Sequence, residues 1–584
     1  MTNKNTEEWR KRTKAPTDTF CLLPWIHLST RPNGHMRVCC TANASSVGAT
    51  NDKKHGGEVG VLKQSDGKPA NLNVTDLMSS WNNDYMKNVR KQMLNGEKPA
   101  SCLKCYAEED AGHMSKRFWE TEYWARRVDL KEIIEETSVE GEIPPKIRYL
   151  DLRLGSKCNL KCIMCSPHDS SLWVPDWIKL HPSIENESLK ETMQWGSKGQ
   201  IDGASYNWHK KNDKFWEQLY EQIPHMKQLY FAGGEATIIE EHYTLLEEVV
   251  KAGYAKNIEL RYNSNGVEMP QRLFDLWDEF KNVRFHYSVD SIGEMNDYIR
   301  FPSKWDHTVK MFHLLDNTGP NVEVTVACAV QALNIYYLPD FVKWKLEQKF
   351  KKINLWPLGA GMINYHFVYH PPHLNVKVLP NWFKEMTHAK FDKFIEWLEA
   401  NWELCTVGER GKDVTYDTWR EAAYGVKRLQ GMLQFSESGD WSRERMPEFI
   451  EYINKMDGIR DTNFRDVFPE MAPLLDWTPD DGDDWDGEFD DRLLRELEEE
   501  AGIVLRDDYV IEMMEPIFLT KSSTSRAYAC ILPLNERDYH EVVAKGDGSV
   551  AESKSKSVKV DIKYIDSVMP SDIISSYMLL KAKE

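Results

Sequence analysis

The sequence contains no run of about 18 apolar residues, which is the length that a membrane-spanning helix needs. Its first 14 residues, MTNKNTEEWRKRTK, are polar and lack the apolar centre of a signal peptide. We therefore expect no membrane partner and a cytoplasmic location.

Positive charge is the minority sign, with 74 Lys and Arg against 92 Asp and Glu and a net charge of −18. Residues 480–500 alone hold 12 acidic and 2 basic residues. This balance argues against broad binding to nucleic acid, although a local basic groove stays open. The hydrophobic content of 41% is enough for folded cores, and 584 residues predict about two to four domains.

Cysteine is scarce as well, at 11 residues, but most of the cysteines are clustered. One group is Cys21, Cys39, Cys40, Cys102 and Cys105, and a second is Cys158, Cys162 and Cys165, whereas Cys328, Cys405 and Cys530 are isolated. The cytosol keeps thiols reduced, so clustered cysteines indicate metal binding rather than disulfides. The isolated cysteines are expected to be small core residues.

From residue 147 onward, short β-branched or aromatic runs alternate with amphipathic helical segments. This alternation predicts βαβ units and an α/β fold with a mainly parallel sheet, here a partial (β/α)6 barrel. Chemistry in such folds gathers at the C-terminal ends of the strands. The predicted strands are residues 147–154, 228–234, 258–264, 283–290, 322–330 and 353–358.

We expect four regions along the chain. Residues 1–125 form a cysteine-rich domain, residues 140–365 the barrel, residues 366–477 a helical extension, and residues 478–584 a small α+β domain. Residues 166–227, with five Trp, are an insertion expected to wall the site.

The second cysteine group lies in GSKCNLKCIMCS, directly after the first predicted strand. Three thiolates spaced by three and two residues can bind three corners of a 4Fe–4S cube and leave the fourth iron open. A catalytic cluster needs this open iron, because a substrate or cofactor must coordinate there. Structural zinc is the alternative, but such a site needs four ligands.

CNLKCIMC resembles the C-x3-C-x2-C signature of the radical S-adenosylmethionine (SAM) superfamily. The resemblance implies that Cys158, Cys162 and Cys165 hold a catalytic cluster and that SAM binds its open iron. It also implies that cleavage of SAM gives methionine and a 5′-deoxyadenosyl radical, which abstracts hydrogen from a substrate. An electron donor such as flavodoxin or ferredoxin is the implied partner.

Residues after the later strands resemble the SAM-binding motifs of the same family. The implied positions are Gly233, Gly234 and Glu235 for the SAM ammonium, Asn263 and Asn265 with Gly266 for a T-N-G turn, Ser288 and Asp290 for the ribose, and Arg300, which looks like an arginine of close relatives. A plain turn is the alternative for Gly-Gly-Glu. Gln331 and Asn334, after the fifth predicted strand, are weaker candidates for this site, and an ordinary role in a loop is equally open for them.

The first cysteine group resembles the twitch/SPASM modules of this superfamily, placed before the barrel as in N-terminal twitch radical SAM proteins. The resemblance implies an auxiliary 4Fe–4S cluster on Cys21, Cys39, Cys102 and Cys105. Cys40 competes with Cys39 for one ligand position. A structural zinc site with four cysteines fits the same spacing.

Residues 495–503, RELEEEAGI, match the second half of the Nudix box REUxEExGU. On a helix, Glu496, Glu499 and Glu500 would share one face and could hold Mg2+. The upstream spacing is one residue short and the leading glycine is missing. A degenerate Nudix fold and a solvated acidic helix therefore both stay open.

The leading hypothesis is a radical SAM oxidoreductase or modifying enzyme that acts on a peptide or protein side chain. The peptide substrate follows only from what related enzymes often modify. The alternatives are a nucleotide or other small-molecule substrate, a Nudix-type pyrophosphate hydrolase, and a catalytically silent Fe–S binding scaffold.

Overall fold

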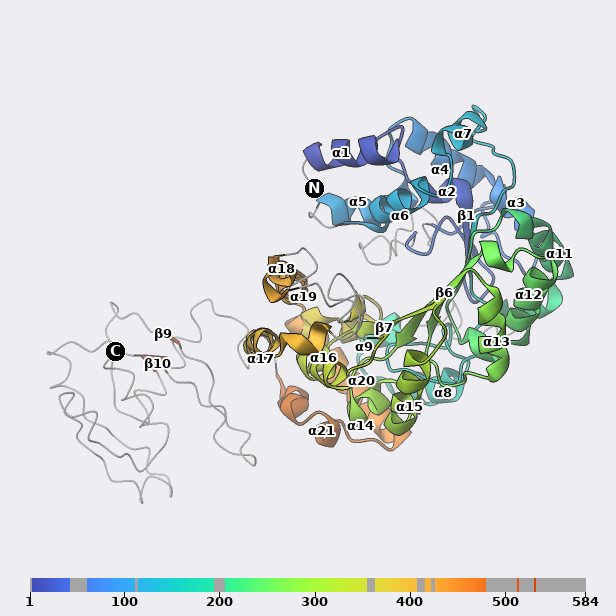
Figure 1. Ribbon diagram of the computed structural model, residues 1–584. Coiled ribbons are helices and arrows are strands. Elements are labelled where there is room, and N and C mark those ends of the chain that lie inside the picture. The colour runs from blue at the N-terminus through green and yellow to red at the C-terminus, as the bar shows by residue number, and fades with distance from the viewer. Residues whose placement is uncertain are drawn as a thin grey trace, which may run out of the picture. The chain divides into compact units, whose positions relative to one another are not determined.

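The computed structural model describes residues 3–42, 60–110, 114–193, 205–353, 363–406, 415–421 and 426–478, with two short strands further on (Figure 1). The chain divides into two compact units. The first comprises Met1–Leu379 with Met386–Pro469, and the second Pro380–Glu385 with Glu470–Glu584. None of the helices in these described ranges is long and apolar enough to cross a membrane.

An eight-stranded sheet forms the centre of the first unit, in the order β2-β1-β3-β4-β5-β6-β7-β8. All neighbouring strands from β1 to β8 are parallel, and β2 pairs antiparallel with β1. The α/β class is therefore confirmed. The strands are β1 (His27–Thr30), β2 (Met36–Arg37), β3 (Tyr149–Leu152), β4 (Gln228–Phe231), β5 (Glu259–Ser264), β6 (Asn282–Ser288), β7 (Val322–Val330) and β8 (Asn364–Phe367).

Two details of the sheet differ from the sequence prediction. The sixth parallel strand of the barrel is β8, whereas the predicted segment 353–358 lies outside the described residues except for Ile353, which is in a turn. The cysteine-rich N-terminal segment also contributes β1 and β2 to the same sheet. The sequence analysis predicted neither of these strands, which are 4 and 2 residues long.

Helices occupy the segments between and beyond the strands (Figure 1). The N-terminal helices are α1 (Asn3–Thr13), α2 (Leu23–Ile26), α3 (Leu77–Trp81), α4 (Asp84–Leu94), α5 (Leu103–Asp110), α6 (Lys116–Ala125) and α7 (Leu130–Glu135). The insertion and barrel helices are α8 (Trp173–Ser183), α9 (Glu187–Thr192), α10 (Trp208–Lys211), α11 (Asp213–Gln222), α12 (Glu240–Lys251), α13 (Gln271–Glu279), α14 (Gly293–Ile299), α15 (Trp305–Asp316) and α16 (Leu338–Glu347). The later helices are α17 (Asn381–Ala400), α18 (Tyr416–Glu421), α19 (Val426–Glu437), α20 (Ser442–Arg460) and α21 (Phe464–Val467).

The two faces of the sheet differ in chemistry because side chains alternate along each strand. On one face Phe231 packs on His242 of α12, and Tyr262 packs on Trp277 of α13. On the other face Arg261 stacks on Trp119 of α6, with 5.9 Å from its guanidinium carbon to the ring centroid. The outer face is thus apolar beneath the barrel helices, and the inner face is polar beneath α6.

Candidate cluster and SAM site

The second cysteine group lies on the loop between β3 and α8, where its three thiols meet. Cys162 and Cys165 share a hydrogen bond, and Cys158 interacts electrostatically with both. Burial, followed by the negative charge of Glu235, raises the pKa of Cys158 to about 12. Because a metal must replace the proton of each thiol, this buried trio is suited to a positively charged partner.

N–H donors face two of these sulfurs. The Leu160 backbone N donates to Cys158 Sγ at 3.5 Å, and Asn265 Nδ2 donates to the same sulfur at 3.7 Å. Arg300 Nη1 lies 3.8 Å from Cys162 Sγ. Such donors favour the thiolate form, so the donor set fits cluster ligands. Within the described ranges, no group of three or more His, Cys, Asp or Glu side chains is placed to hold a single metal ion. The thiolates of an iron–sulfur cluster do not need that arrangement, because each of them binds a different iron.

Backbone pairing fixes the loop against the segment that carries Arg300. The Lys161 N donates to Phe301 O and the Ile163 N donates to Ile299 O, both at 2.7 Å. These two bonds flank Arg300 in the sequence and explain why its guanidinium reaches Cys162.

Helix α20 holds the same loop from a position almost 300 residues later. Tyr452 Oη donates to Ile163 O at 2.7 Å, and Arg460 Nη2 donates to Lys161 O at 2.7 Å. The Arg460 guanidinium also stacks on Trp173, at 4.5 Å from the ring centroid. Sequence reasoning missed both residues because no local motif marks a side chain that braces a distant loop.

The Trp-rich insertion contributes to this loop as well. Trp173 at the start of α8 is fully buried, and its Nε1 donates to Cys162 O at 2.9 Å. Lys161 forms an ion pair with Asp176 of α8 at 2.7 Å. The insertion therefore packs directly behind the cysteines.

Gly234 lies where the loop after β4 crosses the cysteine loop. Its φ is +60°, and a Cβ at this position would come 2.6 Å from Lys157 O. The neighbouring Glu235 N donates to the same carbonyl at 2.8 Å. Only glycine permits this close backbone approach.

The Glu235 carboxylate braces the ends of β4 and β5. It is 1% exposed, and burial raises its pKa. Its Oε1 accepts hydrogen bonds from Ser264 Oγ at 2.8 Å and from both the N and the Oγ1 of Thr237, at 3.3 and 3.0 Å. Its Oε2 accepts from the Asn265 N at 2.8 Å. A carboxylate offers about four acceptor positions, so Oε2 retains capacity for one more donor.

The other motif residues lie on the ends of β5 and β6. Asn263 pairs in register with His286, and Ser288 pairs with Ala327. The Asn265 amide, besides facing Cys158, donates to Asn159 Oδ1 at 2.8 Å. The structure therefore brings these residues to the same edge of the sheet as the cysteine loop.

Asp290 is fully buried, and its carboxylate contacts other residues of the protein. Its carboxylate accepts from the Ala329 N at 2.7 Å and forms an ion pair with Arg300 Nε at 2.8 Å. Asn334 Nδ2 donates to the Asp290 backbone O at 2.9 Å. Asp290 thus holds Arg300 beside Cys162, and Asn334 braces the Asp290 backbone. The contact of Asp290 with the SAM ribose stays a prediction.

Gln331, at the end of β7, is fully buried, and neither of its side-chain polar atoms has a hydrogen-bond partner among the described residues. A buried amide without partners is costly, so it favours a ligand that can both donate and accept.

Four cysteines of the first group, Cys21, Cys39, Cys102 and Cys105, together line a small pocket of about 20 Å³. Burial, reinforced by Cys39, raises the pKa of Cys105 to about 12. Cys40 does not line this pocket, and its Sγ accepts from Lys116 Nζ at 2.8 Å. The geometry therefore groups Cys39, rather than Cys40, with the other three.

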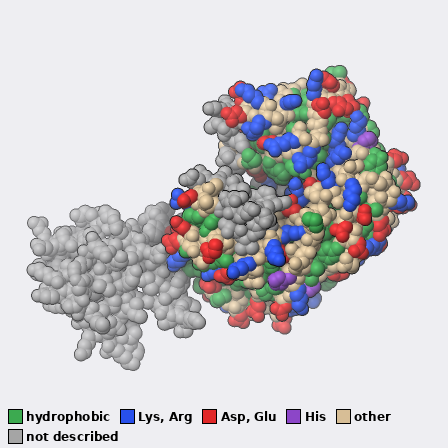
Figure 2. All heavy atoms as spheres, in the orientation of Figure 1, with side chains coloured by type: hydrophobic (Ala, Val, Ile, Leu, Met, Phe, Trp, Pro, Cys, Tyr) green, Lys and Arg blue, Asp and Glu red, His purple; other side chains and the backbone are tan. Residues whose placement is uncertain are grey.

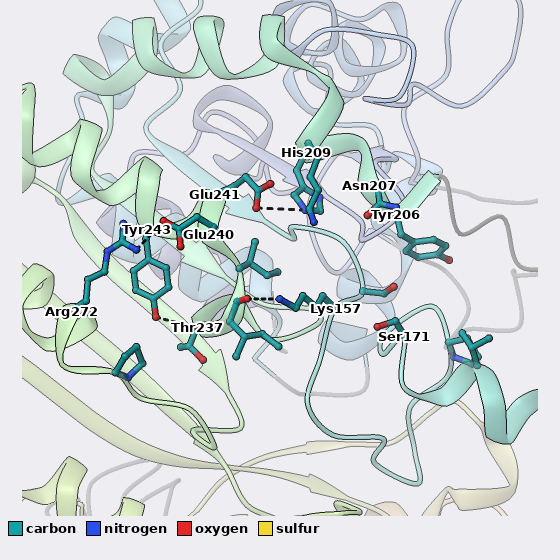
Figure 3. Close-up of a pocket in the computed structure, with 17 residues that line it drawn as sticks. Lys157, Ser171, Tyr206, Asn207, His209, Thr237, Glu240, Glu241, Tyr243 and Arg272 are labelled. Carbon is teal, nitrogen blue, oxygen red and sulfur yellow. Dashed lines mark hydrogen bonds and ion pairs between the residues drawn. The ribbon is translucent and has the colours of Figure 1, made fainter.

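A larger cavity of about 730 Å³ adjoins the cysteine loop at Lys157 and is also lined by His209, Glu241 and Arg272 (Figure 3). Lys157 Nζ donates to Ile238 O across it at 3.0 Å. None of the residues predicted to bind SAM lines this cavity.

The predicted Mg2+ ligands Glu496, Glu499 and Glu500 lie outside the described residues. In the C-terminal segment the structure describes strands β9 (Glu512–Met513) and β10 (Cys530–Ile531), which pair antiparallel. The Nudix interpretation stays a prediction.

No family model and no curated protein matches the chain. Similar solved structures include SuiB of Streptococcus suis, at 12% identity over 46% of this chain, with a TM-score of 0.24. They also include TYW1 with a lysine-pyruvate adduct bound (15% identity, 43% of this chain and 71% of TYW1, TM-score 0.22) and anSMEcpe with bound AdoMet (14%, 56% and 98%, TM-score 0.24). The chain spans 53% of the length of SuiB. Similarity at these TM-scores is too weak to support a statement about fold or function.

Proposed function

We propose that this chain is a radical SAM enzyme that holds a 4Fe–4S cluster on Cys158, Cys162 and Cys165 and abstracts hydrogen from a peptide or protein side chain. When bound, the cluster and SAM supply a reductive cleavage that yields methionine and a 5′-deoxyadenosyl radical. The observation that supports the proposal is the convergence of three buried thiols on the loop after β3, with N–H donors facing two of the sulfurs.

The chain's own residues stabilise negative charge at these sulfurs. Arg300 places a guanidinium near Cys162, and Asp290 fixes that guanidinium through a 2.8 Å ion pair. Asn265 donates to Cys158 while its own backbone N is bound to Glu235. Charge and N–H donors at ligand sulfurs tune a cluster's reduction potential, so Arg300 and Asn265 are positioning residues in this proposal.

For SAM itself we propose Gly233, Gly234 and Glu235, together with Asn263, Asn265 and Ser288. The free acceptor position of Glu235 Oε2 suits an ammonium group. The unpartnered amide of Gln331 suits a group with both a donor and an acceptor, as an adenine edge has.

We propose further that Cys21, Cys39, Cys102 and Cys105 hold an auxiliary 4Fe–4S cluster. The convergence of these four thiols on one pocket supports the proposal, and a zinc ion in the same place would be distinguished by metal analysis. An electron donor such as flavodoxin or ferredoxin belongs to the proposed activity.

Anaerobic reconstitution with iron and sulfide, followed by dithionite and SAM, tests the proposal. We expect about eight irons per chain for two clusters, and release of 5′-deoxyadenosine measured by mass spectrometry. Cys162→Ala should abolish that release and keep about half of the iron. Cys405→Ala, which removes a buried but isolated thiol, is the matched control and should retain both. A fully loaded protein that releases no 5′-deoxyadenosine contradicts the proposal.

A further inference from the structure

A row of polar side chains crosses the inner face of the sheet. The strand register places Asp151, Tyr230, Arg261 and Arg284 side by side on β3, β4, β5 and β6. Arg37 of β2 extends the row, with one residue of β1 between it and Asp151. Residues paired in register point to the same face, so these side chains share the space beneath α6.

One end of the row is electrically balanced. Arg284 Nε lies 3.6 Å from a carboxylate oxygen of Glu259 and 3.5 Å from one of Glu323. Tyr123 of α6 closes this end through hydrogen bonds to Glu259 at 3.2 and 3.3 Å.

The other end carries excess positive charge. Arg37, Arg261 and Arg153, which directly follows β3, lie there, and Asp151 is the one carboxylate of the described residues within ion-pair distance of any of them, 3.5 Å from Arg153 Nε. Burial, reinforced by the charges of Arg153 and Arg31, lowers the pKa of Arg37 to about 10. The crowding of cations is felt at Arg37, whereas the charges of Asp151 and Tyr230 raise the pKa of Arg153 and those of Tyr149 and Tyr230 raise the pKa of Arg261, in both cases against the effect of burial.

Neutral groups compensate these cations only in part. Arg261 donates to His286 Nε2 at 3.1 Å and stacks on Tyr230 at 5.2 Å. Arg37 donates to the Cys40 backbone O at 3.1 Å and is 5% exposed. Buried cations without a carboxylate are costly, and a ligand anion would offset that cost.

The position of Arg153 connects this cluster to the proposed SAM site. A Cβ built at Gly233 would lie 3.2 Å from Arg153 Cδ, so the arginine stem packs on the Gly-Gly-Glu loop. The Arg153 side chain is 23% exposed, which leaves it accessible to a ligand. Figure 2 shows a hollow between the N-terminal helices and the rest of the unit, with Lys and Arg side chains among those on its wall.

We propose that Arg37, Arg153 and Arg261 form a subsite for an anionic group of the substrate, a carboxylate or a phosphate, with Arg153 as the contact residue. Planar guanidinium groups bind both anions through paired N–H donors. The assignment of the anion to the substrate rests on the proposed function, because the subsite adjoins the loop proposed to bind SAM.

Calorimetric titration of the iron-loaded full-length protein in the presence of SAM tests the subsite. Inorganic phosphate is titrated in one series and succinate in another, at constant ionic strength, which distinguishes the two anions. We expect one of them to bind with a Kd below ~1 mM and Arg153→Gln to weaken it at least ~10-fold. Arg284→Gln, in the same row but paired with two carboxylates, should stay within ~2-fold.

Two outcomes would overturn the subsite: no binding of either anion by the wild type, or equal losses of affinity in Arg153→Gln and Arg284→Gln. Arg153→Lys provides a second variant if Arg153→Gln fails to fold, because it keeps the charge and should weaken binding by less. Formation of 5′-deoxyadenosine is measured separately. Anion binding without that product contradicts the proposed function, whereas product formation without anion binding contradicts the subsite.

Discussion

Gly233 and Gly234 offer a matched pair of substitutions that differ in one physical respect. Both have positive φ, +75° and +60°, so alanine at either position pays a backbone cost of about 1–2 kcal/mol. At Gly233 the new methyl would meet the flexible Arg153 side chain at 3.2–3.4 Å. At Gly234 it would meet the Lys157 backbone O at 2.6 Å, and this carbonyl directly precedes Cys158.

The clash at Gly234 must move the cysteine loop. Real Cβ atoms essentially never come within 3.0 Å of another heavy atom, so the Lys157 carbonyl must shift by at least 0.4 Å, the difference between 3.0 and 2.6 Å. Cluster ligands tolerate little displacement. We therefore expect Gly234→Ala to lose about half of the reconstituted iron and nearly all SAM cleavage, while Gly233→Ala keeps its iron.

Iron analysis, visible absorbance and thermal unfolding of both variants test this expectation. Gly234→Ala should lose more stability than Gly233→Ala, because its backbone clash adds to a similar cost of positive φ. Equal iron contents in the two variants would refute the reasoning, since backbone strain would then account for both.

Three further predictions concern residues around the two cysteine groups. Cys39→Ala should reduce the iron content from about eight to about four, whereas Cys40→Ala should leave it unchanged, as iron analysis would show. Tyr452→Phe leaves the Ile163 carbonyl without its 2.7 Å donor and should cost about 1–3 kcal/mol of unfolding free energy, measured by denaturant titration. Arg300→Gln leaves a buried carboxylate unpaired and should cost about 3–5 kcal/mol by the same assay. It should also shift the cluster's reduction potential, measured by redox titration; an unchanged potential would contradict the role assigned to Arg300.

The barrel could be predicted from sequence because each of its first five strands has the alternation that the structure uses. In YLDL and ELRYNS the leucines fall on the face that packs under helices, and the charged residues fall on the other face, which Tyr149 shares with Asp151. The cysteine spacing was equally informative, since all three ligand candidates lie within eight residues. Features of this kind depend only on residues that are close together in the sequence, so they can be predicted without knowledge of the fold.

The contacts that complete the site were not predictable in the same way. Tyr452 and Arg460 are ordinary residues of a long helix until the fold brings α20 against the cysteine loop. The ion pair between Asp290 and Arg300 was not predictable from the motif, which indicated only a ribose contact for Asp290; that contact stays a prediction. The C-terminal segment stays a prediction for a simpler reason, as residues 479–511 lie outside the described ranges.

The shared sheet leads to a last prediction about the cysteine-rich segment. Since β1 pairs with β3, removal of residues 1–125 would leave the β3 edge without its partner and would strip His27 and Trp124 from the Tyr149 ring, at centroid distances of 4.1 and 5.7 Å. An unpaired parallel strand edge next to exposed apolar surface promotes aggregation. We therefore expect the chain from residue 126 onward to be insoluble or to lack cooperative unfolding by circular dichroism. A truncated protein that folds cooperatively and still cleaves SAM would instead show that the barrel is stable without the segment that extends its sheet.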